Sequence, residues 1–152
     1  MINKIISGGQ TGADQAALDV AIELGIPHGG WIPKGRITEA GPLPDKYNLQ
    51  EMATDSYPKR TEQNVIDSSA TVIFSHGELT GGSELTSTIA DKHYKPCLHL
   101  DMNKMSKSYA SRLLKTWLID TGIEVLNVAG PRASGDPKIY DAAIAVLTIA
   151  LK

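Results

Sequence analysis

Only one cysteine, Cys97, occurs in the 152-residue chain, so no disulfide can form within it. No apolar stretch approaches the length that a membrane-spanning helix needs. Neither sign of charge dominates, because 15 basic and 17 acidic residues give a net charge of −2. This balance gives no electrostatic reason to expect a nucleic acid or an anionic membrane as partner. Any anion must therefore be held by local geometry and not by overall charge. Residues 2–7 predict a strand rather than a charged and apolar leader, so we expect a cytoplasmic protein.

The chain alternates short apolar runs with longer helical segments, which predicts one α/β domain over residues 1–152. Strands are predicted at residues 2–7, from Ile26 to the Gly29-Gly30 pair, and at 71–74, 97–100 and 123–128. Helices are predicted over residues 14–24, 61–68, 83–93, 106–120 and 137–151. This alternation favours a Rossmann-like, three-layer, doubly wound parallel sheet of about five strands.

Residues 31–58 break the alternation with four prolines, and only residues 47–53 permit a short helix. A long irregular excursion inside a small domain is usually functional. We therefore interpret residues 31–58 as a lid-like insertion over a binding site.

Three predicted strands end in turns that contain glycine. The turns are Gly8-Gly9-Gln10-Thr11-Gly12, Thr80-Gly81-Gly82-Ser83 and Ala129-Gly130-Pro131-Arg132. Glycine lets the backbone approach a ligand, and the helix that follows presents unpaired N–H groups. Numbered along the chain, a strand order of 2-1-3-4-5 would make the two double-glycine turns face each other at the switch point, so we expect that order. The turns predict a site for a phosphorylated small molecule or oxyanion.

Two familiar nucleotide motifs are missing. Ser7 stands where the dinucleotide fingerprint begins with glycine, and the second strand ends in His28-Gly29-Gly30 without an acidic residue, which argues against NAD or FAD. No Gly-Lys-Ser or Gly-Lys-Thr of a P-loop occurs anywhere. The histidines show no paired metal spacing, and Cys97 lies inside a strand as a core residue would, so we expect no metal site in the protein itself. His76 is the one histidine that directly follows the third predicted strand.

The segment Gly8-Gly9-Gln10-Thr11-Gly12-Ala13-Asp14 resembles the opening of the molybdenum carrier (molybdenum-cofactor carrier protein-like) family. Further matches follow in order over nearly the whole chain: Tyr57-Pro58-Lys59-Arg60-Thr61 with Asn64, Leu79-Thr80-Gly81-Gly82-Ser83, and Asn127-Val128-Ala129-Gly130-Pro131-Arg132. The resemblance implies a Rossmann-like fold. It also implies kinship with molybdenum-cofactor (molybdopterin) carriers and with the lysine-decarboxylase-like cytokinin phosphoribohydrolases.

The hydrolase relatives carry a G-G-x-G-T-x-x-E turn, whose glutamate takes part in breaking the N-glycosidic bond. The corresponding stretch here has no third glycine, and Thr88 occupies the glutamate position. This departure favours binding without turnover. We therefore predict a molybdenum carrier that binds the cofactor phosphate, with Arg60 and Arg132 as candidate partners of the anion.

Two alternatives stay open: a nucleoside monophosphate phosphoribohydrolase, in which Glu84 or Asp14 would be catalytic, and a nucleotide-sensing module. All three readings use the same pocket, and a homo-oligomer, dimer or tetramer, is expected with each. The predicted ligand-binding residues are Gly8, Gly9, Gln10, Thr11, Gly12, Asp14, Arg60, Gly81, Gly82, Ser83, Gly130 and Arg132.

Overall fold

A parallel sheet lies at the centre of the protein, whose computed structural model describes residues 2–152. The sheet contains β1 (Lys4–Ile6), β2 (His28–Gly29), β7 (Ala70–Ser75), β8 (Cys97–Asp101) and β9 (Val125–Ala129). Its order is β2-β1-β9-β7-β8, and every neighbouring pair is parallel. All six residues of β7 are buried, as expected for a strand covered on both faces. The predicted Rossmann-like α/β class is confirmed.

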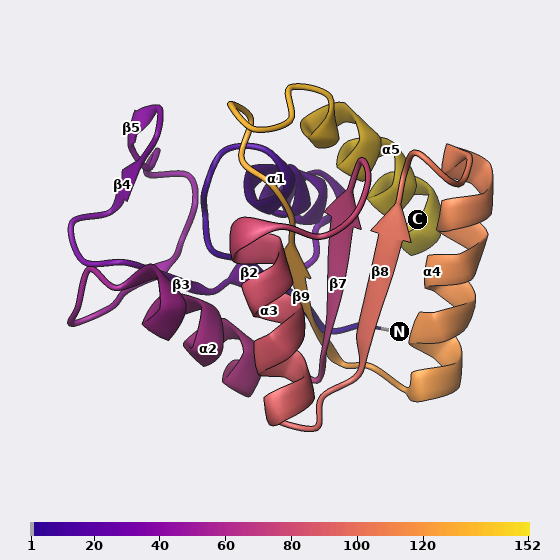
Figure 1. Cartoon of the computed structure of the whole chain (residues 1–152), viewed down its shortest axis with the longest axis horizontal. Coiled ribbons are helices and arrows are strands. Elements are labelled where there is room, and N and C mark those ends of the chain that lie inside the picture. Colours follow the sequence, from indigo (N-terminus) through magenta and orange to yellow (C-terminus); the bar gives the residue numbers. More distant parts are fainter. Residues whose placement is uncertain (1) are drawn as a thin grey trace.

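Helices cover both faces of the sheet (Figure 1). On one face, α1 (Ala13–Leu24), α4 (Lys107–Thr121) and α5 (Ile139–Leu151) share the main hydrophobic core with the strands. On the other face, α2 (Tyr57–Asp67) and α3 (Gly81–Lys92) pack together through a smaller cluster of Val65, Ile89 and Ala90. The helix α2 begins earlier than predicted, because Ser56 caps it by accepting a 3.3 Å hydrogen bond from the Lys59 N–H and Pro58 suits the first turn.

The predicted strand order is wrong in one respect. The C-terminal strand β9 lies between β1 and β7, so the order along the chain is 2-1-5-3-4 and not 2-1-3-4-5. Strands that follow one another in the chain are joined through helices of similar length, so local sequence patterns do not specify which strand lies next to which. The inserted strand places the Gly130 turn between the two double-glycine turns.

Residues 31–55 form two small sheets beside the central one. The strands β3 (Trp31–Ile32) and β6 (Gln50–Glu51) pair in parallel, and β4 (Ile37–Thr38) and β5 (Gly41–Pro42) form an antiparallel pair. The permitted helix over residues 47–53 does not form, because the N–H groups of Gln50 and Met52 bond the carbonyls of Gly30 and Ile32. Figure 1 shows this insertion projecting to one side of the sheet.

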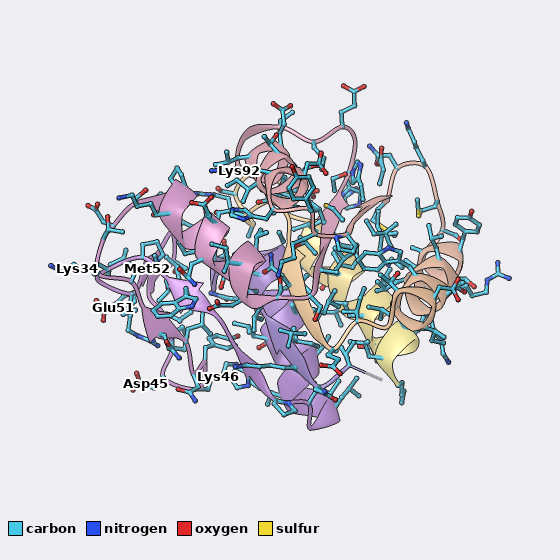
Figure 2. The ribbon with its side chains drawn as sticks, turned by 90° about the horizontal axis from the view of Figure 1, so that it is seen from below. Lys34, Asp45, Lys46, Glu51, Met52 and Lys92 are labelled. Atoms are coloured by element: carbon cyan, nitrogen blue, oxygen red, sulfur yellow. The ribbon has the colours of Figure 1, made fainter. Side chains whose placement is uncertain are left out.

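The insertion is anchored to α1 and does not cover the site. Ile32, Leu43, Tyr47 and Leu49 pack with Leu18 of α1 in a separate buried cluster. In Figure 2, Lys34, Asp45 and Glu51 lie along the outer edge of this segment. No residue of 31–58 lines the main pocket, so the lid expected over residues 31–58 flanks the pocket in this structure.

Candidate functional site

The carboxyl ends of β1, β7 and β9 surround one pocket of about 380 Å³. Its volume lies within the range of small-molecule sites. All three glycine-containing turns contribute to it, joined by the start of α2. The lining residues are Gly8, Gln10, Asp14, Arg60, Thr61, Asn64, Ser75, His76, Glu78, Leu79, Thr80, Gly81, Gly82, Ser83, Thr86, Asn127, Val128, Ala129, Gly130, Pro131, Arg132, Gly135 and Asp136.

The first glycine turn uses most of its own N–H groups internally. The Gly9 N–H donates to Ser7 Oγ at 3.4 Å, the Gln10 N–H to Asp14 Oδ2 at 3.2 Å, and the Thr11 N–H to Gln10 Oε1 at 3.0 Å. The Asp14 carboxylate also lies in the first turn of α1, where it offsets the positive end of the helix dipole. This turn therefore presents a carboxylate to the pocket instead of the expected cradle of N–H groups for an anion.

Asp14 is a buried acid inside the pocket, with 8% of its surface exposed. Burial raises the pKa of its carboxyl from 3.8 to about 6, and the nearby Arg60 guanidinium opposes that rise. Asp14 Oδ1 accepts no hydrogen bond from the described residues and is not among their fully enclosed polar atoms. This oxygen is thus open to a donor from a ligand.

Arg60 reaches the first turn from α2. Its Nη1 donates a 2.6 Å hydrogen bond to the Gly8 carbonyl, and its guanidinium lies over the Tyr57 ring. A Cβ on Gly8 would lie 2.3 Å from Arg60 Nη1 and 2.9 Å from Asp14 Oδ2. Glycine is required at this position because both side chains occupy the space beside it.

The second glycine turn opens α3 directly onto the pocket. Thr80, Gly81, Gly82 and Ser83 all line it, and the Thr80 side chain makes no cap hydrogen bond. The N–H groups of Ser83 and Glu84 bond the Thr80 carbonyl, whereas those of Gly81 and Gly82 have no acceptor among residues 2–152. Free N–H groups at a helix N-terminus are a general anion-binding feature.

Neighbouring strands hold this turn in place. The Asp101 carboxylate accepts from the Gly77 N–H at 2.8 Å, which lowers the pKa of Asp101. The Ser75 hydroxyl donates to the Gly77 carbonyl at 2.6 Å and accepts from His99 Nε2 at 2.6 Å. Gly77 itself has φ 106°, a conformation that favours glycine. The start of α3 is therefore preorganised by β7 and β8.

The third turn packs tightly against the first. A Cβ on Gly130 would lie 2.6 Å from Ala13 Cβ, and one on Gly12 would lie 2.4 Å from the Pro131 carbonyl oxygen. Arg132 lines the pocket with 48% of its side chain exposed, and its Nε lies 4.0 Å from Glu39 Oε1. An exposed guanidinium beside one partly exposed carboxylate keeps donors free for an incoming anion.

Glu39, from the insertion, ties these two turns together. Its carboxylate accepts hydrogen bonds from the Thr11 hydroxyl and from the N–H and hydroxyl of Ser134. These bonds lower the pKa of Glu39. Through these bonds the insertion links the first and third turns at the side of the pocket. We call this contact of Glu39 with Thr11 and Ser134 the clasp.

Nine of the predicted site residues line the pocket, and three do not. Gly9 packs towards Leu49, Thr11 bonds Glu39, and Gly12 permits the close approach of Pro131, so all three serve the shape of the loop. Glu84 is exposed on α3 and does not line the pocket either. Cys97 is half-buried within β8, where burial raises the pKa of its thiol, and it does not line the pocket.

Sequence reasoning missed Asp136, Ser75 and Thr86, which line the pocket, and assigned no role to His76. His76 Nδ1 lies 2.6 Å from Asp136 Oδ2, so the loops after β7 and β9 meet through this pair. The two partners are 60 positions apart in the sequence, which hides the pairing from local motif analysis. Within residues 2–152, no group of three or more histidine, cysteine, aspartate or glutamate side chains could hold a metal ion.

The fold and pocket define a Rossmann-like domain with a small-molecule site at the carboxyl edge of its sheet. The chain belongs to the circularly permuted YpsA SLOG family, whose model matches residues 5–151. Among solved structures, it is similar to a "Putative molybdenum carrier protein" from Syntrophus aciditrophicus SB. The two chains are 55% identical, the match covers 99% of this chain and 96% of that one, and the TM-score is 0.98. No match was found among curated proteins.

The permutation is visible in the sheet. If β9 and α5 came first in the chain, the strands would follow the order 3-2-1-4-5 known from dinucleotide-binding folds. Ile2 and Lys152 line one shared groove, so the two ends of the chain lie close together, as such a rearrangement requires. None of the helices in the described part of the chain is long and apolar enough to cross a membrane.

Proposed function

We propose that this protein is a carrier that binds a phosphorylated small molecule, the molybdenum cofactor, and that it does so without turnover. The phosphate lies against the start of α3. The observation that carries the proposal is the pair of N–H groups on Gly81 and Gly82, two residues that line the pocket and whose N–H groups have no acceptor among the described residues.

Charge near the α3 turn supports an anion there. Arg132 lines the same pocket and remains half exposed, so it is free to form charge-assisted hydrogen bonds with phosphate oxygens. Arg60 has a different role, because its guanidinium is committed to the Gly8 carbonyl and lies beside Asp14. The two double-glycine turns thus have different roles. The turn at the start of α3 binds the anion, and the first turn positions the Asp14 carboxylate.

Asp14 suits the other end of such a ligand. An accessible carboxylate oxygen in a buried setting accepts N–H or O–H donors strongly. The pterin ring of the molybdenum cofactor carries ring and amino N–H groups of this kind. A pocket of about 380 Å³ with an anion-binding end and a donor-binding end is compatible with that ligand. The similarity to a putative molybdenum carrier protein supports the same choice.

The proposed anion site is tested by removing one backbone N–H donor, that of Gly82. Gly82→Pro removes the N–H of residue 82 in the first helical turn, where proline is tolerated, whereas Gly82→Ala keeps the N–H and adds a methyl group to open space. We expect the purified wild type to carry molybdenum and an oxidisable pterin, measured by mass spectrometry and pterin fluorescence. Gly82→Ala should retain both, and Gly82→Pro should lose them while its circular dichroism stays unchanged. A pterin load that is equal in the proline and alanine variants would refute the α3 site.

A phosphoribohydrolase is the second candidate, and the raised pKa of Asp14, about 6, is the observation that favours it. A buried carboxyl of this kind suits proton transfer near neutral pH. Because Glu84 does not line the pocket, hydrolysis would depend on Asp14. Release of free base from nucleoside monophosphates, lost in Asp14→Asn and kept in Glu84→Gln, would replace the carrier assignment.

Self-association into a dimer or tetramer stays a prediction. The exposed Ile119 and Ile149 side chains of α4 and α5 are the apolar surface that such contacts would bury. Light scattering coupled to size exclusion measures the number of subunits.

A further inference from the structure

We propose that His76, positioned by Asp136, takes up a proton when the pocket binds a doubly charged tetrahedral oxyanion and donates a hydrogen bond to it through Nε2. The inference rests on the proposed anion site at α3 and assigns that site a charge requirement. The shared chemistry is a dianionic tetrahedral group, which a phosphate monoester or a free oxyanion such as molybdate can supply.

The charge balance of the pocket motivates the proposal. Carboxylates outnumber guanidinium groups three to two on its lining, and no lysine contributes to it among the residues that the structure describes. A bound dianion would therefore add two negative charges to a lining that is already negative when His76 is neutral. Protonation of His76 makes the lining neutral and lowers this repulsion. The charged and titratable groups that line the pocket are Asp14, Arg60, His76, Glu78, Arg132 and Asp136.

The geometry of the pair suits this role. The Asp136 carboxylate lies 2.6 Å from Nδ1 of His76, so it holds the proton on Nδ1 and fixes the ring. Nε2 then has no partner within residues 2–152 and is the ring nitrogen left for a ligand. The side chains are 25% and 15% exposed, which leaves the ring reachable from the pocket.

The connection between β7 and α3 carries His76, and the free N–H groups of Gly81 and Gly82 open α3 directly after it. Asp136 comes from the opposite loop, after β9. A purely structural role for the pair would be to brace these two loops. If the pair only links the two loops, ligand binding should not change the protonation of His76. Proton uptake therefore distinguishes a structural role from the proposed one.

The experiment is isothermal titration calorimetry at pH 8 with sulfate, molybdate and ribose 5-phosphate, in buffers of different ionisation enthalpy. The buffer supplies the proton, so the proposed protonation appears as a binding enthalpy that changes with the ionisation enthalpy of the buffer. We expect the wild type to take up close to one proton per bound oxyanion. His76→Gln, which still offers Asp136 a donor, should take up none. At pH 6.5 it should bind about 10-fold to 100-fold more weakly, as expected for the loss of one charge-assisted hydrogen bond.

One further variant separates His76 from a histidine outside the pocket. His93 forms a similar pair with Glu62, with 2.8 Å between His93 Nε2 and Glu62 Oε2, and neither residue lines the pocket. His93→Gln should therefore behave as the wild type. Uptake that persists in His76→Gln, or is lost in His93→Gln, would overturn the role of His76.

The three probes also distinguish the source of the oxyanion. Tighter binding of ribose 5-phosphate than of molybdate points to a phosphate ester, and the reverse order points to free oxyanion cargo; either result with His76-dependent uptake supports the inference. If none of the three probes binds the wild type, the α3 anion site itself is wrong and the inference falls with it. Binding without proton uptake refutes the inference alone.

Discussion

Asp14 should destabilise the folded protein at neutral pH. A pKa that rises from 3.8 in the unfolded chain to about 6 in the folded one corresponds to about 3 kcal/mol of unfavourable free energy once the carboxyl is ionised. The folded state holds its proton more tightly, so this penalty is absent below pH 4. It grows as the pH rises towards 6 and is complete above that value. Asp14→Asn removes the charge and leaves an oxygen that can accept from the Gln10 N–H.

We therefore expect Asp14→Asn to raise the free energy of unfolding at pH 7.5 by about 1–3 kcal/mol and to have almost no effect at pH 4. Urea titrations at pH 4, 5, 6 and 7.5, followed by circular dichroism, measure this difference. Asp141 provides the matched control, because it also lies in the first turn of a helix but is exposed. Asp141→Asn should change stability little at any of these pH values.

A stability gain from Asp14→Asn that is the same at pH 4 and pH 7.5 would refute the assignment of the raised pKa to burial of the charge. A loss of stability at pH 7.5 would do so as well, since it would mean that Arg60 outweighs burial. The expected result has a functional meaning. A carboxylate that weakens the fold from inside a pocket is a stability cost typical of a binding group.

Two smaller perturbations test the shape of the site. Gly8→Ala places a Cβ 2.3 Å from Arg60 Nη1 and should displace the guanidinium from the Gly8 carbonyl, lowering the free energy of unfolding by about 1–3 kcal/mol in denaturant titrations. No loss relative to Gly82→Ala, whose added methyl group meets open space, would contradict this contact. Glu39→Ala removes the bonds to Thr11 and Ser134 and should speed limited proteolysis within residues 31–55, with little change in the unfolding midpoint because the Leu18 cluster remains. Cleavage no faster than in Glu23→Ala would show that the clasp does not restrain the insertion.

Some features of the protein follow from local sequence alone. The alternation of strands and helices predicts the α/β class, because residue periodicity reflects which faces are buried. The double-glycine turns at residues 8–9 and 81–82 mark the pocket, because parallel strands deliver their carboxyl ends to one edge. Asp14, Arg60 and Arg132 could be selected as pocket residues from the same motifs.

Other features depend on contacts between distant segments. The sequence does not reveal that the Gly9, Gln10 and Thr11 N–H groups are satisfied internally, since this depends on how the Ser7, Asp14 and Gln10 side chains fold back. The position of residues 31–58 beside the pocket was hidden for a related reason. A hydrophobic cluster with Leu18 holds the segment beside the pocket, and composition does not show where an insertion packs.

The amino-acid sequence by itself determined the class of fold, the turns that form the pocket and most of its charged residues, because periodicity and glycine act over a few neighbouring positions. Only the tertiary structure decided that β9 enters the middle of the sheet and that His76 meets Asp136. It also decided that Asp14 is buried, whereas the Gly81 and Gly82 N–H groups stay free. Burial, pKa and hydrogen-bond satisfaction are set by atoms that come from remote parts of the chain, so they exist only once the chain has folded.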